Sequence, residues 1–457
     1  MSNFTRLIKH FQKNGIAVEA TAFGWNVRNA NAQANILLPH DFALEDKAVQ
    51  QLLNFASVHP SACACATPDF HPGTHAPVGC VVATDPDVVI PRAIGTDINC
   101  GMRTLKTGLN LGQMGMHEKA LQTAMGEVLL NNHRNVPLRT DDFHRLYSQG
   151  PQAFLHDWAK REGQLVDVNS AQRALEWERH VGLLDWDGHA RHAPLLHTAS
   201  EHGWIRDPQL GTPGSGNHFV EVQAVSRVIN KTRAWQEGIK EGDVLVTIHS
   251  GSRDVGFHVG TQWMDRAKAQ WPKGVAHPEH GLYALEGELA TTYLQAMGTA
   301  SRYAWLNRFV IDELMRQAWS KTVGVPAWSL VVDVPHNVIS REHGKNVHRK
   351  GATPAHKDQL GVIPGSMGDS SYLVVGGGNP DWLWSCSHGA GRQVKRQTMR
   401  GTANGVGSWT CLTTNEARKI EEHPSAYKPI GPVIDSQVEQ GLIEGLVELR
   451  PLWTFKT

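Results

Sequence analysis

The sequence lacks any long apolar run and any excess of charge of one sign. Its 457 residues carry 44 Lys and Arg against 44 Asp and Glu, a formal net charge of +0. This balance excludes the highly basic class of general polyanion binders, so a nucleic-acid substrate would need a local basic patch. No apolar run approaches the ~18 residues of a membrane span, and residues 1–10 lack the apolar stretch and cleavage site of a signal peptide. We therefore expect a cytoplasmic protein without a membrane partner.

Cysteine is scarce, with 6 in the whole chain. Because no export signal is present, we do not expect disulfides. Only Cys100 has an acidic neighbour at metal-ligand spacing, Asp97 three residues earlier. The other five cysteines are interpreted as buried thiols. These are Cys63, Cys65, Cys80, Cys386 and Cys411.

The sequence also lacks the Gly-x-x-x-x-Gly-Lys-Ser/Thr motif of a phosphate-binding P-loop. The stretch Gly361–Gly368 instead offers backbone N–H groups and a serine hydroxyl, although, taken alone, an ordinary turn is the favoured explanation. Arg253, Lys350, Arg392 and Lys395 are candidate phosphate contacts, because guanidinium and ammonium groups donate charge-assisted hydrogen bonds to phosphate. Taken singly, each is more often a solvated charge.

Hydrophobic patterning predicts a mixture of strands and helices. Runs of β-branched residues bounded by Gly, Pro and Asp predict strands at residues 79–84, 88–91, 219–222, 243–248, 329–334 and 372–375. Apolar positions three and four residues apart predict helices from 111 to about 187 and from about 285 to 319. We therefore predict an α+β fold, a single mixed catalytic body over residues 1–457 with a helical insertion at about 111–205. Most Trp residues follow the helical spacing, and we expect core packing rather than base stacking from them.

Five residues near strand ends could hold metal ions. Asp97 and Cys100 offer one oxygen and one sulfur ligand, and His218, His249 and His336 each stand at a strand end beside Asn, Ser or Gly. A single histidine among 25 is more often a hydrogen-bonding residue, but the shared setting favours ligation. Mixed sulfur, nitrogen and oxygen ligation suits manganese, zinc or iron. Two ions roughly 3.5–4 Å apart would neutralise phosphate oxygens and orient an in-line displacement.

His388 stands apart from the ligand candidates. It lies among small residues and an arginine in Ser385–Arg392, a setting in which a phosphate can approach closely. A further histidine that is not needed as a metal ligand is a candidate nucleophile. Together these fragments predict metal-assisted phosphoryl or nucleotidyl transfer.

In this order, the fragments resemble the RtcB family of RNA ligases. The resemblance covers about residue 15 to the C-terminus. The segments that carry it are Pro68–His71, Asp97–Gly101, Gly216–Glu221, His249–Arg253, His336–Asn337, Arg349–Gly351, Pro364–Gly368, Ser387–Arg392 and Ala426–Lys428.

The resemblance implies a ligase that depends on GTP and two Mn²⁺ ions. Such an enzyme joins RNA 3′-phosphate or 2′,3′-cyclic phosphate ends to 5′-hydroxyl ends, in RNA repair or tRNA splicing. It implies that His388 becomes guanylylated and passes the guanylyl group to the RNA 3′-phosphate. It also implies that Cys100 bridges the two ions, one completed by Asp97 and His218 and the other by His249 and His336.

The resemblance further implies a guanylate pocket and a set of RNA phosphate contacts. The phosphate contacts are Arg253, Lys350 and Arg392. The pocket residues are Asn217, His218, Phe219, Val220, Glu221, His336, Asn337, Pro364, Gly365, Ser366, Met367, Ser371, His388, Gly389, Ala390, Gly391, Tyr427 and Lys456.

Three departures from the family pattern bear on RNA specificity. His75 stands where the family carries a second glycine, Thr457 follows Lys456 where the family usually ends Lys-Gly, and the helical stretch between Cys100 and His218 is longer. One alternative function is a metal-dependent RNA phosphodiesterase or phosphatase that forms no covalent nucleotide adduct. Another is a catalytically silent RNA-binding protein, which predicts disrupted ligands that this sequence does not have. The sequence gives no signal for an activating protein or an oligomeric state.

Overall fold

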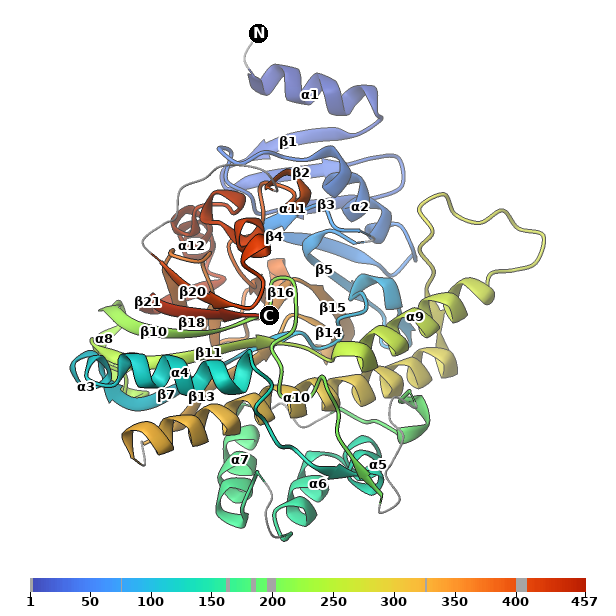
Figure 1. Cartoon of the computed structure of the whole chain (residues 1–457). Helices are drawn as coiled ribbons and strands as arrows, with labels where there is room; N and C mark the ends of the chain where they lie inside the picture. Colours follow the sequence, from blue (N-terminus) through green and yellow to red (C-terminus); the bar gives the residue numbers. More distant parts are fainter. Residues whose placement is uncertain are drawn as a thin grey trace.

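The structure is a computed structural model that describes residues 3–74, 76–161, 165–181, 186–194, 203–324, 327–399 and 409–457 (Figure 1). Two large sheets and a layer of helices make up the described part, so the predicted α+β class is confirmed. No described helix is both long and apolar enough to cross a membrane. His75, one of the departures from the family pattern, lies outside the described residues.

The first sheet carries the predicted metal ligands. Its strand order is β13 (Ser329–Pro335), β7 (Gly101–Asn110), β11 (Asp243–Ser250), β10 (Phe219–Val228), β21 (Ile443–Lys456), β18 (Ser371–Gly376) and β17 (Leu360–Ile363), and β20 (Thr410–Thr413) pairs with β21. All neighbours along this order are antiparallel.

The register of this sheet gathers four strand ends at one edge. Phe219 lies opposite His249, His249 lies opposite Met102, and Pro335 lies opposite Gly101. Cys100, His218 and His336 each stand one residue beyond these paired positions. Strand pairing therefore places all three beside His249.

The second sheet carries the segment around Asp69. Its order is β1 (Ala17–Thr21), β2 (Gly24–Arg28), β3 (Gln33–Ile36), β4 (Cys63–His71), β5 (Val78–Thr84), β15 (Lys345–Lys350) and β14 (Asn337–Glu342). The pairing of β4 with β5 is irregular between Ala66 and His71, which frees the backbone around Asp69 from a regular ladder. Helix α1 (Asn3–Lys13) precedes this sheet, and α2 (Asp46–Ala56) packs its apolar face on it. Separately, β16 (Ala352–Pro354) pairs with β19 (Ser385–Ser387), which ends just before His388.

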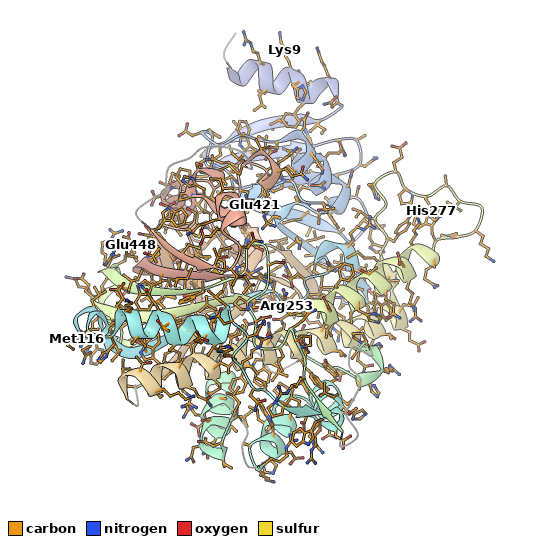
Figure 2. All side chains as sticks on the ribbon, in the orientation of Figure 1. Lys9, Met116, Arg253, His277, Glu421 and Glu448 are labelled. Carbon is orange, nitrogen blue, oxygen red and sulfur yellow. The ribbon has the colours of Figure 1, made fainter. Side chains whose placement is uncertain are left out.

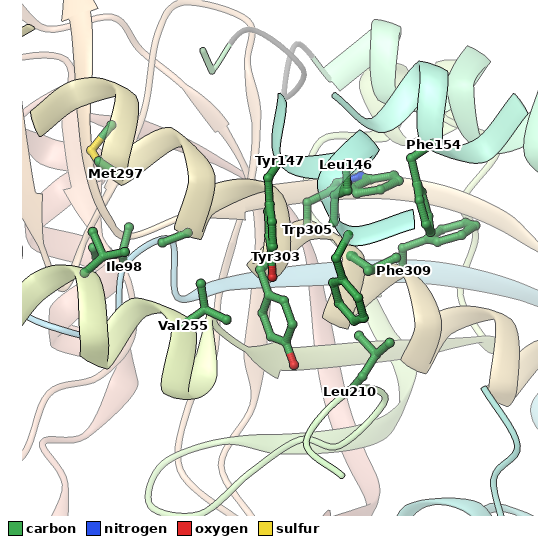
Figure 3. Packing of buried hydrophobic residues seen from close by; sticks show 14 of the residues in the cluster. Ile98, Leu146, Tyr147, Phe154, Leu210, Val255, Met297, Tyr303, Trp305 and Phe309 are labelled. Atoms are coloured by element: carbon green, nitrogen blue, oxygen red, sulfur yellow. The ribbon is translucent and has the colours of Figure 1, made fainter. Parts of the chain in front are cut away.

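Helix α10 (Gly287–Val323) lies along the first sheet, and α9 (Arg253–Ala269) packs against α10 beyond the end of β11 (Figure 1). Figure 3 shows aromatic residues of α10 packed against neighbouring elements, among them Tyr303, Trp305 and Phe309. The rings of Trp305 and Phe309 stack with centroids 5.2 Å apart. The expected core role holds for the fully buried Trp158, Trp263, Trp305 and Trp319, whereas Trp235 in α8 (Lys231–Gln236) is 82% exposed.

Most of residues 111–205 is helical, as predicted. The helices are α3 (Leu111–Gly115), α4 (Glu118–Leu129), α5 (Thr140–Gln149), α6 (Pro151–Trp158) and α7 (Val168–Val181). The purely helical prediction was wrong in one respect, because β8 (Leu138–Arg139) pairs with β9 (Trp204–Ile205). That this segment is an insertion into the family's fold stays a prediction.

Two other local predictions were wrong. The strand predicted at 88–91 ends early: β6 (Val88–Val89) pairs with β12 (Leu285–Glu286), and a 3₁₀ turn begins at Pro91, whose ring nitrogen has no hydrogen to donate to a ladder. All six cysteines are free thiols, but Cys63 is exposed rather than buried because it opens β4 at its outer end. The remaining helices are α11 (Arg396–Met399) and α12 (Ile430–Glu439).

Candidate active site

Asp97, Cys100, His218, His249 and His336 form one cluster at the gathered strand ends. Nε2 of His218 and Nε2 of His249 each lie 3.2 Å from Sγ of Cys100. Nε2 of His218 also lies 3.0 Å from a carboxylate oxygen of Asp97, and Nε2 of His249 lies 3.3 Å from Nε2 of His336. The five side chains thus form two groups of three that share the Cys100 thiol. The structure brings together all five residues that the sequence predicted as ligands.

Burial and mutual repulsion keep two imidazoles of the cluster neutral. Burial lowers the pKa of His249 and of His336 well below the usual value, and neighbouring histidines lower both further. Burial raises the pKa of the Cys100 thiol, and the Asp97 carboxylate raises it further. Burial also works to raise the pKa of Asp97, but the charge and hydrogen bond of His218 outweigh it and hold that pKa below its usual range. A bound cation would supply the charge that deprotonates the thiol.

The donor set fits divalent transition metals. The Nε2 atoms of His249 and His336 face each other and the Cys100 sulfur, an arrangement in which neutral rings present lone pairs to a shared point. Nδ1 of His249 is buried and has no hydrogen-bond partner in the structure. Two three-ligand groups that share one sulfur would suit two ions with a bridging thiolate. The residues therefore fit the predicted metal centre.

Arg308 of α10 holds the loop that carries Cys100 and the end of strand β11 that carries His249. Its guanidinium donates to the carbonyl oxygen of Asn99 at 2.8 Å, to that of Ser250 at 3.1 Å, and to the Asn99 side chain at 3.0 Å. Asn99 has a φ of 55°, a left-handed conformation that Asn tolerates better than most side chains. One buried guanidinium thus sets the spacing between two predicted ligands.

The charge of Arg308 is balanced inside the fold. Asp333 accepts from Nε of Arg308 at 2.9 Å and from Arg103 at 3.1 Å, and Arg103 also donates to Asp312 at 2.8 Å. The indole N–H of Trp328 donates to the second oxygen of Asp312 at 2.7 Å. The two arginines and two aspartates are almost completely buried, so loss of one partner would leave an uncompensated charge.

His388 lies next to the cluster and is held by a buried carboxylate. Nδ1 of His388 lies 2.5 Å from Oδ2 of Asp69, and the His388 backbone N–H donates to the same oxygen at 3.3 Å. Asp69 is fully buried, and the Thr67 hydroxyl donates to its other oxygen at 2.6 Å. The rings of His388 and His336 have centroids 4.6 Å apart. Because the carboxylate accepts the Nδ1 proton, the lone pair of the neutral ring is assigned to Nε2.

Close packing holds Asp69 within reach of His388. Gly391 has a φ of 76°, and a Cβ there would lie 2.4 Å from the Asp69 carbonyl oxygen. The ammonium of Lys428 donates to the carbonyl oxygens of Pro68 at 3.0 Å and Phe70 at 2.7 Å. Burial lowers the pKa of Lys428 to about 8, while the Asp69 carboxylate raises it. Gly391 and Lys428 thus fix the strand segment on both sides of the carboxylate.

Two predicted phosphate contacts lie beside the cluster. Arg253 begins α9 near the centre of the molecule (Figure 2), and its Nη1 lies 3.4 Å from Nδ1 of His218. Lys350 ends β15, where burial lowers its pKa and the charges of Asp97 and Cys100 raise it. Lys395 is exposed. Arg253 and Lys350 therefore place positive charge next to the ligand groups.

A second polar group lies on β10, three residues beyond His218. Glu221 accepts from the Thr454 hydroxyl at 2.5 Å and from Nε2 of Gln223 at 2.8 Å, and Gln223 also donates to Ser371 at 3.0 Å. Burial raises the pKa of Glu221 to about 7, against the opposing effects of Thr454, Gln223 and Lys456. Near neutral pH, Glu221 therefore exists in both protonation states.

Lys456 is docked rather than frayed. It ends β21 in the middle of the molecule (Figure 1), and the parallel strand β20 sets Thr413 opposite it. The preceding residues Trp453 and Phe455 are buried. Burial lowers the pKa of Lys456, while Glu422, whose carboxylate lies 3.8 Å from Nζ, raises it. The exposed Thr457 follows without altering this position.

Arg392 lies with Lys456 rather than with the metal ligands. Its guanidinium donates to Oε1 of Glu422 at 2.8 Å and to the carbonyl oxygen of Glu421 at 2.5 Å, and it lies 4.7 Å from the ring centre of Tyr427. The Tyr427 hydroxyl donates to the other oxygen of Glu422. The structure therefore groups Arg392, Tyr427 and Lys456 around one carboxylate.

Other residues predicted for the nucleotide pocket are already engaged within the protein. The Asn337 amide donates to the Asp97 carbonyl oxygen at 3.1 Å and accepts from Gly351 N–H at 3.0 Å. Val220 is fully buried, and its strand position is paired with Ile248 on one side and Phe455 on the other, so the structure leaves no part of it exposed to a ligand. Ser366 donates to Asp369 at 3.3 Å.

The turn at residues 364–367 lies between Ser371, which accepts from Gln223, and Gly389, which follows His388. Gly365 N–H donates to Ser371 at 3.3 Å, and a Cβ on Gly389 would lie 3.5 Å from the Pro364 carbonyl oxygen. Met367 and Ala390 are buried, and Asn217 is exposed at the mouth of the cluster. The ring of Phe219 meets that of His249 edge to face, with centroids 5.3 Å apart.

Three residues with clear contacts to the site were not assigned a role from the sequence. Asp69 stood inside Pro68–His71, one of the segments that carry the resemblance. A carboxylate in such a segment was the signal that could have found it. Arg308 and Glu422 carried no such signal, because an internal helical arginine and a glutamate in a charged stretch resemble many others.

The geometry defines a protein with two adjoining groups of side chains that could hold metal ions, beside a histidine oriented by a buried carboxylate. A family model described as tRNA-splicing ligase RtcB matches residues 51–457. The chain is 31% identical to tRNA-splicing ligase RtcB of Thermococcus kodakarensis over 90% of this chain and 91% of that protein. It is 32% identical to tRNA-splicing ligase RtcB of Archaeoglobus fulgidus, covering 90% and 92%. It is 33% identical to RNA-splicing ligase RtcB of Mycobacterium bovis, covering 86% and 96%.

The chain therefore belongs to the RtcB family, and it is an enzyme of the RNA ligase class. Its sequence departs from these relatives at about two positions in three, yet the five cluster residues and His388 lie together in the fold.

Proposed function

We propose that this enzyme joins RNA 3′-phosphate or 2′,3′-cyclic phosphate ends to 5′-hydroxyl ends, with GTP as co-substrate and two Mn²⁺ ions. The position of His388 carries the proposal: Asp69 holds Nδ1, and the ring lies against His336 of the metal-type cluster. A nucleophile at the rim of a two-ion site suits nucleotidyl transfer better than simple hydrolysis, for which water would serve.

The first chemical step is the formation of a covalent adduct at His388. Nε2 attacks the α-phosphorus of GTP, an N–P bond forms, and the bond to the β-phosphate oxygen breaks with release of pyrophosphate. Asp69 stabilises the positive charge that develops on the imidazole, because it accepts the Nδ1 proton in a hydrogen bond throughout.

Two further steps complete the ligation. At a 2′,3′-cyclic phosphate end, water must open the ring beforehand, adding to phosphorus as the bond to the 2′ oxygen breaks, which leaves a 3′-phosphate and a 2′-hydroxyl. An oxygen of the RNA 3′-phosphate attacks the same phosphorus as His388 did, the N–P bond breaks, and the guanylyl group is carried on the RNA end. The 5′-hydroxyl oxygen then attacks the RNA 3′-phosphorus, loses its proton and displaces GMP. Arg253 and Lys350 lie beside the cluster and supply positive charge where RNA phosphates would bind.

The proposed metal centre has one ion on Asp97, Cys100 and His218 and the other on Cys100, His249 and His336. Ions at these positions would neutralise phosphate oxygens and hold the reacting groups in line.

The proposed guanine site lies at the end of the paired strands β10 and β21, where β10 begins and β21 ends. Guanine presents an acceptor at O6 and donors at N1 and N2. Lys456 offers a donor and Glu221 an acceptor, and both lie at the same end of paired strands. Tyr427 and Phe219 offer aromatic faces, and the turn at residues 364–367 offers backbone N–H groups.

Incubation with α-³²P-labelled GTP and Mn²⁺ tests the proposal. Wild-type protein should acquire label that survives denaturation, and His388→Ala should acquire none while it retains its metal. Addition of RNA with a 3′-phosphate and RNA with a 5′-hydroxyl should discharge the label and give a joined product. Cleavage or dephosphorylation of the RNA without any labelled protein would instead identify a phosphodiesterase or phosphatase.

We also propose tRNA halves as the physiological substrate, because two of the relatives are named tRNA-splicing ligases. Residues 1–457 would act as one ligase domain, in which the helices between 111 and 205 are an addition on the side of α10. Comparison of tRNA halves with generic oligonucleotides that carry the same ends would test the choice of substrate.

A further inference from the structure

We propose that Glu422 is a positioning residue that sets the selectivity of the enzyme for guanine. Its carboxylate would do so by fixing Lys456 and Tyr427 relative to Arg392. This inference rests on the proposed use of GTP and adds a residue outside the set predicted from the sequence.

The contacts of Glu422 carry the proposal. Oε1 accepts from Arg392 at 2.8 Å and lies 3.2 Å from Nε of Arg396. Oε2 accepts from the Tyr427 hydroxyl and lies 3.8 Å from Nζ of Lys456. One carboxylate therefore links four groups that come from three separate segments of the chain.

Burial makes these contacts strong enough to matter. The Glu422 side chain is 7% exposed, and those of Lys456 and Arg392 are 12% and 14% exposed. Solvent screening is weak at such positions, whereas exposed ion pairs contribute little. Burial works to raise the pKa of Glu422, but Lys456, Arg392 and Arg396 outweigh it and lower that pKa. The carboxylate is therefore charged whenever the enzyme is active near neutral pH.

The need for such a residue follows from the flexibility of lysine. An ammonium on a four-carbon stem has many rotamers, and only some of them place Nζ where it could donate to O6 of guanine. Glu221 lies on the other side and also raises the pKa of Lys456, but it is protonated part of the time. Glu422 is the permanent anion of the two carboxylates, so it limits the positions that Nζ of Lys456 can take.

Adenine carries an amino group where guanine carries O6. A lysine held in place would accept GTP and repel ATP, whereas a lysine free to move would discriminate less. The same carboxylate anchors Tyr427, whose ring would stack on the base, so its loss should affect nucleotide recognition before it affects the chemical step.

The test compares Glu422→Gln with wild type and with Glu416→Gln, a matched change at a 71% exposed carboxylate in the same 3₁₀ segment. The rate of adduct formation at His388 is measured against the concentration of GTP and of ATP. We expect Glu422→Gln to raise the KM for GTP about tenfold, to change kcat less than twofold and to lower the GTP over ATP preference about tenfold. Glu416→Gln should match wild type.

A double-mutant cycle with Lys456→Met shows whether Glu422 acts through the lysine. The double variant should discriminate no worse than Lys456→Met alone. If Glu422→Gln does not fold, Glu422→Asp keeps the charge one methylene further away and should lose part of the selectivity. Unchanged selectivity in either variant would overturn the proposal, as would tighter GTP binding, which would mean that the carboxylate competes with the nucleotide. Failure of the wild type to form an adduct would instead overturn the proposed function.

Discussion

Asp69 and His388 lie 319 residues apart in the sequence, yet the carboxylate of the first is 2.5 Å from Nδ1 of the second. The irregular end of β4 and the loop after β19 bring them together. This contact fixes which ring nitrogen carries the lone pair, so it determines whether His388 can act as a nucleophile.

Asp69→Asn should slow adduct formation at His388 by about 100-fold or more. The asparagine amide would donate to Nδ1, which moves the imidazole proton to Nε2 and removes the lone pair from the attacking nitrogen. Single-turnover labelling with saturating GTP measures the rate, and metal analysis should show unchanged Mn²⁺ content. A rate equal to that of wild type would mean that Asp69 has no part in orienting the histidine.

Cys100→Ala should lower bound Mn²⁺ by at least one ion per chain and block adduct formation. The thiol is the atom that both ligand groups share, so its loss affects both positions. Metal content of the purified variant, read by mass spectrometry, checks this. Cys65→Ala, which removes a buried thiol of β4 in the other sheet and outside both ligand groups, is the matched control and should keep its metal. Full occupancy in Cys100→Ala would contradict the bridging role.

The stability of the wild type should fall relative to Glu221→Gln as pH rises from about 5 to 8. The fold raises the pKa of Glu221 to about 7 from an ordinary 4.5, so the native state favours the protonated form. Its contribution is complete below about pH 4.5 and is lost as pH rises through 7. The difference should approach roughly 3 kcal/mol, since one pKa unit corresponds to about 1.4 kcal/mol. Denaturant unfolding at several pH values measures it, and parallel curves would show that Glu221 does not titrate in this range.

Removal of Lys456 and Thr457 should weaken adduct formation at limiting GTP about tenfold or more, with the melting temperature nearly unchanged. The burial of Trp453 and Phe455 anchors β21 even when the last two residues of the chain are removed, whereas the proposed donor to guanine is lost. Removal of Thr457 alone is the control and should have no effect, because that side chain is exposed. Full guanylylation by the shorter truncated chain would show that Lys456 does not recognise the base.

Sequence patterns located the ligands but not their arrangement. A strand signal after His218 and strand signals before His249 and His336 predicted that each would stand at a strand end, and the structure agrees. Which strands pair, and in what register, depends on contacts between residues far apart in the chain, so the gathering of all three beside Cys100 was beyond local reasoning. The strands β8 and β9 were not predicted either. Each has only two residues, and their pairing joins positions far apart in the chain.

Charged residues inside the fold were the least predictable part of the site. Glu422 stands next to Glu421 in a polar segment, a pattern that is typical of solvent-exposed surface. Arg308 stands on a helix among apolar core positions, where nothing in the sequence marks it. Each acquires its role from partners supplied by other segments, Lys456 for the first and Asn99 for the second.

The hydrogen bonds of Arg308 tie the loop of Cys100 to the end of β11 that carries His249, and these bonds involve no metal ion. Ligands that the scaffold already holds need no folding transition to bind a metal ion. A zinc finger differs, because its chain folds only when zinc binds. Ions could then be exchanged or stripped while the scaffold stays intact. Under the proposed two-ion mechanism, the enzyme would lose activity when metal is scarce and regain it when metal returns, without unfolding in between.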